Sequence, residues 1–429
     1  MVKNDFLTYQ AQTSSHPLSI EIKKAKGSYI YDINGKKYLD FVAGVSANSL
    51  GHQHPKVTRA IKKQLNKYTH VMVYGEFIQD QPVQLSKLLS KTLPNIFSVY
   101  LTNSGTEACE GALKLAKRHT KRSEIIACHH SYHGNTQGSM SVSGAEIQNR
   151  AFRPLVPGSK FIHYNSLEDL KKITTNTAAV ILETIQGGAG FIVPQNDYLA
   201  KVKQRCEDVG ALMIVDEIQT GIGRTGKFWG FENYGIISDI IITGKGLGGG
   251  MPIGAFIAQK KLMDLLKNQP KLGHITTFGG HPVIASAAVA TVNTIQNSTL
   301  IEETLEKEKL IRELLKQGVE VDVQLIADTS MNVKKYMIGS VTEGLKTKVI
   351  KEIVASIGAS LSSFKEASDM LANYLQEYVK DPNIRQVLAA PKIVGGTKST
   401  ISQVPDGFND ILKSIKKNSD PKRCTIETK

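Results

Sequence analysis

The segment LMIVDEIQTGIGRTGKFWGFENYGIISDIIITGKGLGGGMPIGAFIA, residues 212–258, holds three short apolar runs that glycine-rich stretches separate. With four earlier runs they make seven candidate strands: 99–102, 124–128, 160–163, 178–183, 212–216, 239–243 and 254–258. Segments with helical spacing, such as 106–119 and 197–209, lie between several of them. This alternation predicts an α/β fold with an open, mostly parallel sheet covered by helices. Ligands of such sheets bind beyond the carboxyl ends of the strands, so the residues after each run are candidates for a site.

Outside this region, YIYDI and KKYLDF flank Asn34-Gly35 within residues 20–41. Asn-Gly is the preferred pair of a two-residue type I′ turn, so this segment predicts a β-hairpin. From about residue 285 the pattern becomes helical, with amphipathic candidates at 301–317 and 350–375. We therefore divide the chain into the N-terminal part of a small domain, a large domain and a C-terminal region: 1–48, 49–290 and 291–429.

The 429 residues are 41% apolar and 21% charged, and no apolar run is long enough to span a membrane. The N-terminus, MVKNDFLTYQ, lacks the apolar stretch of a secretory signal, which favours a cytoplasmic location. The four cysteines have neither pairing nor metal-ligand spacing. The net charge of +14 comes in short basic groups without interleaved aromatic residues, so we expect solvated helix faces rather than a nucleic-acid partner.

The first candidate site is TNSGTE, residues 102–107, which follows a strand and opens a helix. Gly105 allows close approach of the backbone, and the N–H groups and hydroxyls of Ser104 and Thr106 can surround a phosphate. The same pattern is also that of an ordinary capped helix.

Two charged residues follow later strands. Asp216 ends the run at 212–216, where a buried carboxylate needs a cationic partner; a helix cap or a structural ion pair is the alternative. Lys245 comes directly after a strand, among glycines. It is either a surface lysine or, where burial and nearby cations lower its pKa, a nucleophile.

Two other motifs suggest sites that we reject. Gly221-x-Gly223-x-x-Gly226 imitates a dinucleotide fingerprint, but no helical stripe follows it. The histidines of HHSYHGNT, residues 129–136, have no acid or cysteine at ligand spacing, so we expect no metal. Tyr132 is instead an aromatic residue near a strand end, where it can stack on a ligand ring.

Pyridoxal 5′-phosphate needs a phosphate cradle, a stacking aromatic, a carboxylate for its ring nitrogen and a lysine for a Schiff base. The motifs above supply all four. Their order resembles class III (subgroup II, ω-type) aminotransferases, nearest the acetylornithine/ornithine and 4-aminobutyrate branches. The resemblance extends from about residue 16 to about 300 and includes GHQHPKV, TNSGTEACEGALKLAK, SYHGNT, LETIQG, IVDEIQTGIGRTG, GKGLGGGMPIGA and TTFGGHP.

This resemblance implies the fold-type I architecture, with a large domain on a seven-stranded sheet and a small α+β domain. It also implies the roles of individual residues. Lys245 would carry the cofactor as a Schiff base and move the substrate proton. Asp216 would bind the ring nitrogen, and Gln219 the ring hydroxyl. Ile218 would pack near the ring, and Tyr132 would stack on its opposite face.

Further roles follow from the same resemblance. His133 would lie beside Tyr132, and Gly105 and Thr106 would bind the phosphate. Thr277 would reach the phosphate of the neighbouring subunit, which implies a homodimer. Glu183 matches the acid of the family's glutamate-proline motif.

The sequence departs from the family pattern at several positions. Thr184 stands where proline is usual, and Gly188 stands where ornithine- and 4-aminobutyrate-type members have a glutamate that pairs with a substrate-binding arginine. The arginine that grips the α-carboxylate has only a faint echo in Arg385. Residues 319–429 do not follow the family, and form a divergent or foreign small domain.

The resemblance implies transfer of an amino group to a 2-oxo acid such as 2-oxoglutarate by a ping-pong route. The donor would be acetylornithine or ornithine, or 4-aminobutyrate and related ω-amines. Aminomutases and decarboxylases of the same fold are alternatives. So is a homologue that binds the cofactor but is inactive because of its altered C-terminal region.

Overall fold

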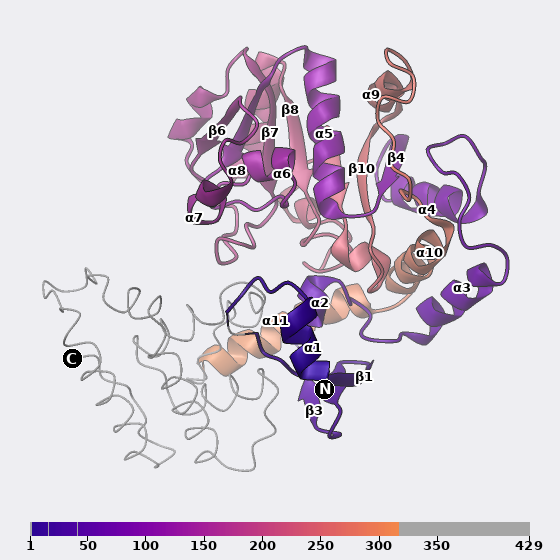
Figure 1. Cartoon of the computed structure of the whole chain (residues 1–429). Helices are drawn as coiled ribbons and strands as arrows, with labels where there is room; N and C mark the ends of the chain where they lie inside the picture. The colour runs from indigo at the N-terminus through magenta and orange to yellow at the C-terminus, as the bar shows by residue number, and fades with distance from the viewer. Residues whose placement is uncertain (1, 16, 41, 317–429) are drawn as a thin grey trace, which may run out of the picture. The chain divides into compact units, whose positions relative to one another are not determined.

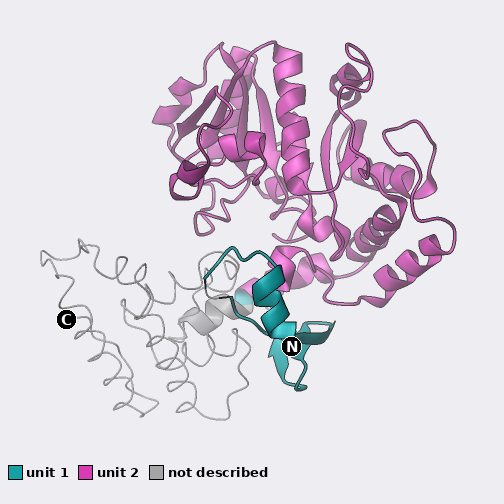
Figure 2. Cartoon of the chain, in the orientation of Figure 1, with its two compact units in different colours: residues 1–42, 309–429 teal, residues 43–308 magenta. Residues whose placement is uncertain are grey.

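The computed structural model describes residues 2–15, 17–40 and 42–316 (Figure 1). The chain divides into two compact units, 1–42 with 309–429 and 43–308 (Figure 2). The domain limits at 48 and 290 stay predictions. The helical pattern at 350–375, Arg385 and most of the divergent region lie outside the described residues. Among the described helices, none has the length and apolar character needed to cross a membrane.

The N-terminal part begins with helix α1 (Val2–Tyr9) and an antiparallel sheet of β1 (Ile22–Lys26), β2 (Tyr29–Asp32) and β3 (Lys37–Leu39). The hairpin is confirmed, but the predicted type I′ turn is wrong. The Gly35 N–H donates to the Asp32 carbonyl at 3.1 Å, and Gly35 has φ 83° whereas Asn34 is not left-handed. The Asp32 carboxylate accepts from the N–H groups of Asn34 and Lys36 at 2.9 and 2.8 Å, which stabilises a three-residue loop with glycine last.

The second unit contains the predicted seven-stranded sheet, in the order β4-β10-β9-β8-β7-β5-β6. Its strands are β4 (Phe97–Thr102), β5 (Glu124–Cys128), β6 (Ser159–Ile162), β7 (Thr177–Glu183), β8 (Leu212–Asp216), β9 (Ile240–Thr243) and β10 (Gly254–Gln259). β10 pairs antiparallel with β4 and β9, and the pairs from β9 to β6 are parallel. The predicted mostly parallel α/β fold is therefore confirmed.

Helices cover this sheet, and the predicted helices 106–119, 197–209 and 301–317 correspond to α5, α8 and α11. The α-helices of the unit and its junction are α2 (Ala43–Ser46), α3 (Pro55–Leu65), α4 (Asp80–Lys91), α5 (Gly105–Thr120), α6 (Gln137–Ser141), α7 (Glu146–Asn149), α8 (Tyr198–Val209), α9 (Lys260–Met263), α10 (Pro282–Gln296) and α11 (Leu300–Lys316). Short 3₁₀ turns are η1 (Arg150–Phe152), η2 (Glu168–Lys172), η3 (Gly230–Tyr234), η4 (Lys245–Gly248) and η5 (Asp264–Lys267). α5 contacts β4, β7, β9 and β10, and in Figure 1 it runs alongside the strands of the sheet.

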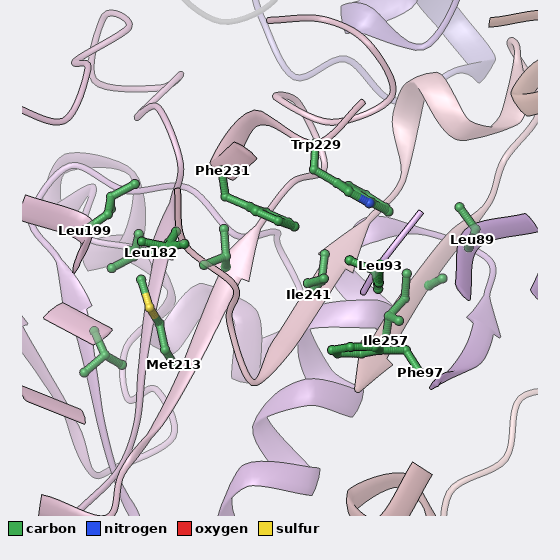
Figure 3. Packing of buried hydrophobic residues seen from close by; sticks show 14 of the residues in the cluster. Leu89, Leu93, Phe97, Leu182, Leu199, Met213, Trp229, Phe231, Ile241 and Ile257 are labelled. Atoms are coloured by element: carbon green, nitrogen blue, oxygen red, sulfur yellow. The ribbon is translucent and has the colours of Figure 1, made fainter. Parts of the chain in front are cut away.

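The central strands are apolar throughout because both faces are buried. Leu182, Val215 and Ile241 belong to one core cluster, which includes Trp229 and Phe231 (Figure 3). The residues that alternate with these along the strands, such as Ile181 and Ile214, belong to a second cluster on the α5 side. Since successive residues of a strand point to opposite faces, the acids at the strand ends are divided between the two faces as well.

Candidate active site

Asp216 is the last residue of β8, and its position in the strand places it on the α5 face. Its side chain is only 4% exposed. Oδ2 lies 2.7 Å from His133 Nδ1, and Oδ1 accepts from the Ile218 N–H at 2.9 Å. His133 is buried, and its Nε2 has no partner in the described part of the chain. The carboxylate is thus fixed in a buried position, with an imidazole behind it.

Lys245 begins η4, two residues after β9 ends. Asp216 pairs in register with Ile242 of β9, so Lys245 lies three residues beyond the partner of Asp216. Its backbone has φ 40°, a left-handed conformation that is costly for a lysine and is typical of functional sites. Burial lowers the pKa of the Lys245 amine, and the negative charges of Asp216 and Glu183 partly oppose this effect. This amine is poised closer to its neutral, nucleophilic form than an exposed lysine is.

Glu183 ends β7 and pairs in register with Asp216. Its two oxygens accept from the N–H groups of Gly187 at 3.0 Å and Tyr132 at 3.2 Å. Burial raises the pKa of Glu183 to about 7. Burial and the charge of Asp216 also raise the pKa of Tyr132. Glu183 therefore ties the loop that carries Tyr132 to the strand ends.

The first turn of α5 lies against the same site. A Cβ added to Gly105 would lie 2.6 Å from Ile218 Cδ1, so the glycine allows Ile218 to approach the helix start. The N–H groups of Gly105 and Thr106 are in the first turn, where an α-helix supplies no acceptor. Ser104 is the N-cap and accepts from the Glu107 N–H at 3.3 Å. The backbone there offers N–H groups to an anion.

The hydroxyl of Thr106 belongs to a small polar cluster. It lies 2.8 Å from Thr136 Oγ1 and 2.7 Å from Ser139 Oγ. Glu110 accepts from the N–H of Ser139 at 3.0 Å. These contacts fix the loop after Tyr132 and His133 on the start of α5.

Gln219 and Gly188 flank the site from two loops. Gln219 Nε2 donates to Ser46 Oγ at 3.4 Å, and a Cβ on Gly187 would lie 2.2 Å from Gln219 Oε1. Gly188 is exposed, and a Cβ there would make an ordinary contact of 3.4 Å with Tyr132 Cβ. Thr277 is exposed, and no hydrogen bond joins it to the other site residues within the described chain. All the predicted site residues except Thr277 thus converge on one edge of the sheet.

Sequence analysis did not identify two further polar groups near this edge. Arg224 donates to the Ser46 carbonyl and the Ser49 hydroxyl. Buried Glu217, next to Asp216, accepts from Thr184 Oγ1 on the opposite face of the sheet. Arg224 lies within a glycine-rich loop, and Glu217 directly follows Asp216, which was already a candidate. No local sequence pattern therefore distinguishes Arg224 or Glu217 as a functional residue.

The rejected alternatives can also be compared with the structure. Residues 219–226 form turns rather than the start of a helix, as the rejection of a dinucleotide fingerprint predicts. No group of three potential metal ligands occurs within residues 2–15, 17–40 and 42–316.

These residues fit pyridoxal 5′-phosphate on structural grounds. The start of α5 supplies N–H groups for a phosphate, and a buried carboxylate suits a protonated ring nitrogen. His133 Nε2 is an orphaned buried polar atom beside that carboxylate. Lys245, with its lowered pKa, completes the set needed for covalent attachment.

Known proteins are similar to this chain in sequence and in fold. A family model described as aminotransferase class-III matches residues 9–343. The acetylornithine aminotransferase of Methanocaldococcus jannaschii is 35% identical over 382 residues, 84% of this chain and 93% of that protein. A [LysW]-aminoadipate semialdehyde/glutamate semialdehyde transaminase of Sulfurisphaera tokodaii is 37% identical over 300 residues, 70% of this chain and 76% of that protein.

Among solved structures, an ornithine aminotransferase from Toxoplasma gondii superposes with a TM-score of 0.69 at 32% identity, covering 73% of this chain and 76% of that one. The comparisons favour transamination over the mutase, decarboxylase and inactive alternatives. The chain belongs to the class-III aminotransferase family and is a transaminase that depends on pyridoxal 5′-phosphate.

Proposed function

We propose that Lys245 attaches pyridoxal 5′-phosphate covalently and that its Nζ then moves the proton at the reacting carbon of the substrate. Asp216 holds the proton on the ring nitrogen. The observation that carries this assignment is the buried Asp216 carboxylate between His133 and the Ile218 N–H, with Lys245 beyond the neighbouring strand. When bound, the cofactor supplies an electron-withdrawing ring that stabilises negative charge on the reacting carbon.

The remaining predicted residues position the cofactor. We propose that the N–H groups of Gly105 and Thr106 bind its phosphate, with Ser104 ordering the helix start. Tyr132 covers one face of the ring, and Ile218 packs near the ring. Gln219 binds the ring hydroxyl, and His133 supports Asp216. Glu183 orders the loop that bears Tyr132 through its bond to the Tyr132 N–H.

We propose acetylornithine or ornithine as the first choice of amino donor, and 4-aminobutyrate or a related ω-amine as the second. The acceptor is a 2-oxo acid such as 2-oxoglutarate. Similarity to the acetylornithine and semialdehyde transaminases supports an amine at the end of an aliphatic chain. A donor and an acceptor that use the same site in turn give ping-pong kinetics.

We propose that the working unit is a homodimer in which Thr277 reaches the neighbouring phosphate. Exposed apolar side chains next to Thr277 in the chain support this, since Ile275 and Phe278 are 48% and 52% exposed. The ring of His70 lies 4.9 Å from the ring of Phe278, measured between their centroids. A second copy of the chain would cover this surface. The cytoplasmic location stays a prediction.

The test of the proposed function is half-reaction spectroscopy on the cofactor-loaded protein with a panel of amines. We expect loss of the absorbance band of the lysine-bound cofactor with ω-amines and its recovery on addition of 2-oxoglutarate. Absence of any change with every amine would contradict the proposal. Turnover without added 2-oxo acid would point to a mutase or decarboxylase instead.

A further inference from the structure

We propose that Arg224 binds a carboxylate of the 2-oxo acid acceptor. The inference rests on the proposed function of the site and extends it to the substrate. Arg224 lies in the loop that follows β8 and Asp216, and it contacts the segment that packs on Gly246, the residue after Lys245.

The guanidinium of Arg224 is only partly used. Its Nη2 donates to the Ser46 carbonyl at 3.1 Å and to Ser49 Oγ at 2.9 Å. Neither acceptor carries a charge. Within residues 42–309, no Asp or Glu forms an ion pair or a hydrogen bond with Arg224, whose side chain is exposed. The remaining N–H groups of the planar fork are therefore open to a ligand, and two of them can bind both oxygens of a carboxylate.

The two acceptors place this guanidinium next to Lys245. Ser49 and Ser46 lie against Gly246, since a Cβ there would be 2.5 Å from Ser49 Oγ and 3.6 Å from the Ser46 carbonyl. Gln219 also reaches Ser46, at 3.4 Å from its Oγ. Arg224 is thus connected through one short segment to the residue after Lys245 and to a second proposed cofactor ligand.

The backbone of that segment is strained. Residues 43–46 have φ values of 49°, 61°, 57° and 67°, so four successive residues are left-handed and only one of them is glycine. Such conformations persist where the surroundings impose them, and they gather at functional sites. The last residue of this turn, Ser46, is the one whose carbonyl accepts from Arg224.

The charges of the site support the same role. The positive charge of Arg224 helps to lower the pKa of the Lys245 amine, after the larger effect of burial. Asp216 and Glu183 act in the opposite direction and do not contact Arg224. A substrate carboxylate would neutralise the free guanidinium close to the reacting amine. This gives the chain a carboxylate anchor within its large unit.

The binding arm of the test uses glutarate, a dicarboxylate that cannot be transaminated, and follows the rise in melting temperature of the cofactor-loaded protein. We expect Arg224→Gln to weaken glutarate binding about 10- to 100-fold, because charge-assisted hydrogen bonds are lost. Arg224→Lys keeps the charge but loses the planar fork of N–H groups. Its affinity for glutarate should lie between those of the unsubstituted protein and Arg224→Gln. Lys227→Gln, which removes an exposed cation of the same loop, should leave the affinity unchanged. Unchanged affinity in Arg224→Gln overturns the proposal.

The kinetic arm compares half-reactions. Arg224→Gln should raise the KM for 2-oxoglutarate by a similar factor and leave reaction with 1-aminobutane, which has no carboxylate, within about 3-fold. An equal loss of reactivity toward 2-oxoglutarate and 1-aminobutane would show that Arg224 has a structural role, and would overturn the proposal. If the unsubstituted protein reacts with no amine, the proposed function fails, whereas the glutarate arm still decides the role of Arg224.

Discussion

The ends of β7 and β8 carry buried side-chain oxygen atoms on both faces of the sheet. The groups that contact these oxygen atoms differ between the two faces. On the α5 face, Glu183 and Asp216 contact loop N–H groups and His133, with Lys245 nearby. On the opposite face, Thr184 Oγ1 donates to Glu217, which also accepts from the N–H groups of Gly230 and Phe231 at 2.7 and 3.0 Å.

The difference shows that burial alone does not identify a functional acid. Burial raises the pKa of both Glu183 and Glu217 to about 7. A Cβ on Gly230 would lie 3.2 Å from both Glu217 oxygens, so the protein itself closes that face. Asp216 instead has a histidine with a free nitrogen behind it and a lysine nearby. These differences favour the α5 face as the one that binds a ligand.

The largest effect should come from Lys245→Ala on the α5 face. Turnover should fall by at least about 10²- to 10⁴-fold, the contribution of a positioned proton-transfer group alone. Borohydride reduction should no longer trap the cofactor on the protein, as measured by mass spectrometry. Lys227→Ala, in an exposed loop position, is the matched control and should trap it fully. An adduct at the original yield in Lys245→Ala would remove this lysine from the proposed mechanism.

The next largest effect is expected for Asp216→Asn. Turnover should fall by about 100-fold, at the lower end of the range given for Lys245→Ala. The amide keeps the shape of the side chain but cannot hold a proton on a ring nitrogen by its charge. Glu217→Gln, the equivalent change on the closed face, should keep turnover within about 3-fold. Similar losses in the two variants, measured as kcat in the same assay, would remove the distinction between the faces.

The residues that the structure brings together at the strand ends on the α5 face could be predicted from the sequence because their signals are local. The apolar strands are buried on both sides, so each run and the polar residue after it stand out, as at Asp216 and Lys245. Contacts between distant segments left no such signal. Arg224 meets Ser46 and Ser49 across more than 170 residues, and Thr184 meets Glu217 across a strand pair.

Local chemistry also misled at one position. Asn34-Gly35 predicted a two-residue turn, but the Asp32 carboxylate accepts from two N–H groups of the loop and favours a longer one. Asx-type hydrogen bonds of this kind compete with the turn that the central pair prefers.

Glu217 on the closed face should make the free energy of unfolding depend on pH. An ordinary glutamate has a pKa of 4.5, whereas Glu217 in the folded chain is raised to about 7. Between these values the folded state binds more protons than the unfolded state, so the free energy of unfolding falls as pH rises. One such group contributes on the order of 3 kcal/mol. Glu217→Gln has no proton to lose and should show a flatter profile between pH 4.5 and 7 in urea unfolding. An identical slope would mean that Glu217 does not titrate in this range.

The smallest effect is expected for Thr184→Val, which removes the hydroxyl from the closed face while keeping the side-chain shape. Glu217 would lose the Thr184 hydroxyl but keep the N–H groups of Gly230 and Phe231. The free energy of unfolding should therefore fall by only about 1 kcal/mol, as for one hydrogen bond, with kcat almost unchanged. A large loss of kcat in Thr184→Val without loss of stability would show that the closed face also positions Asp216, because Glu217 is its neighbour in the chain.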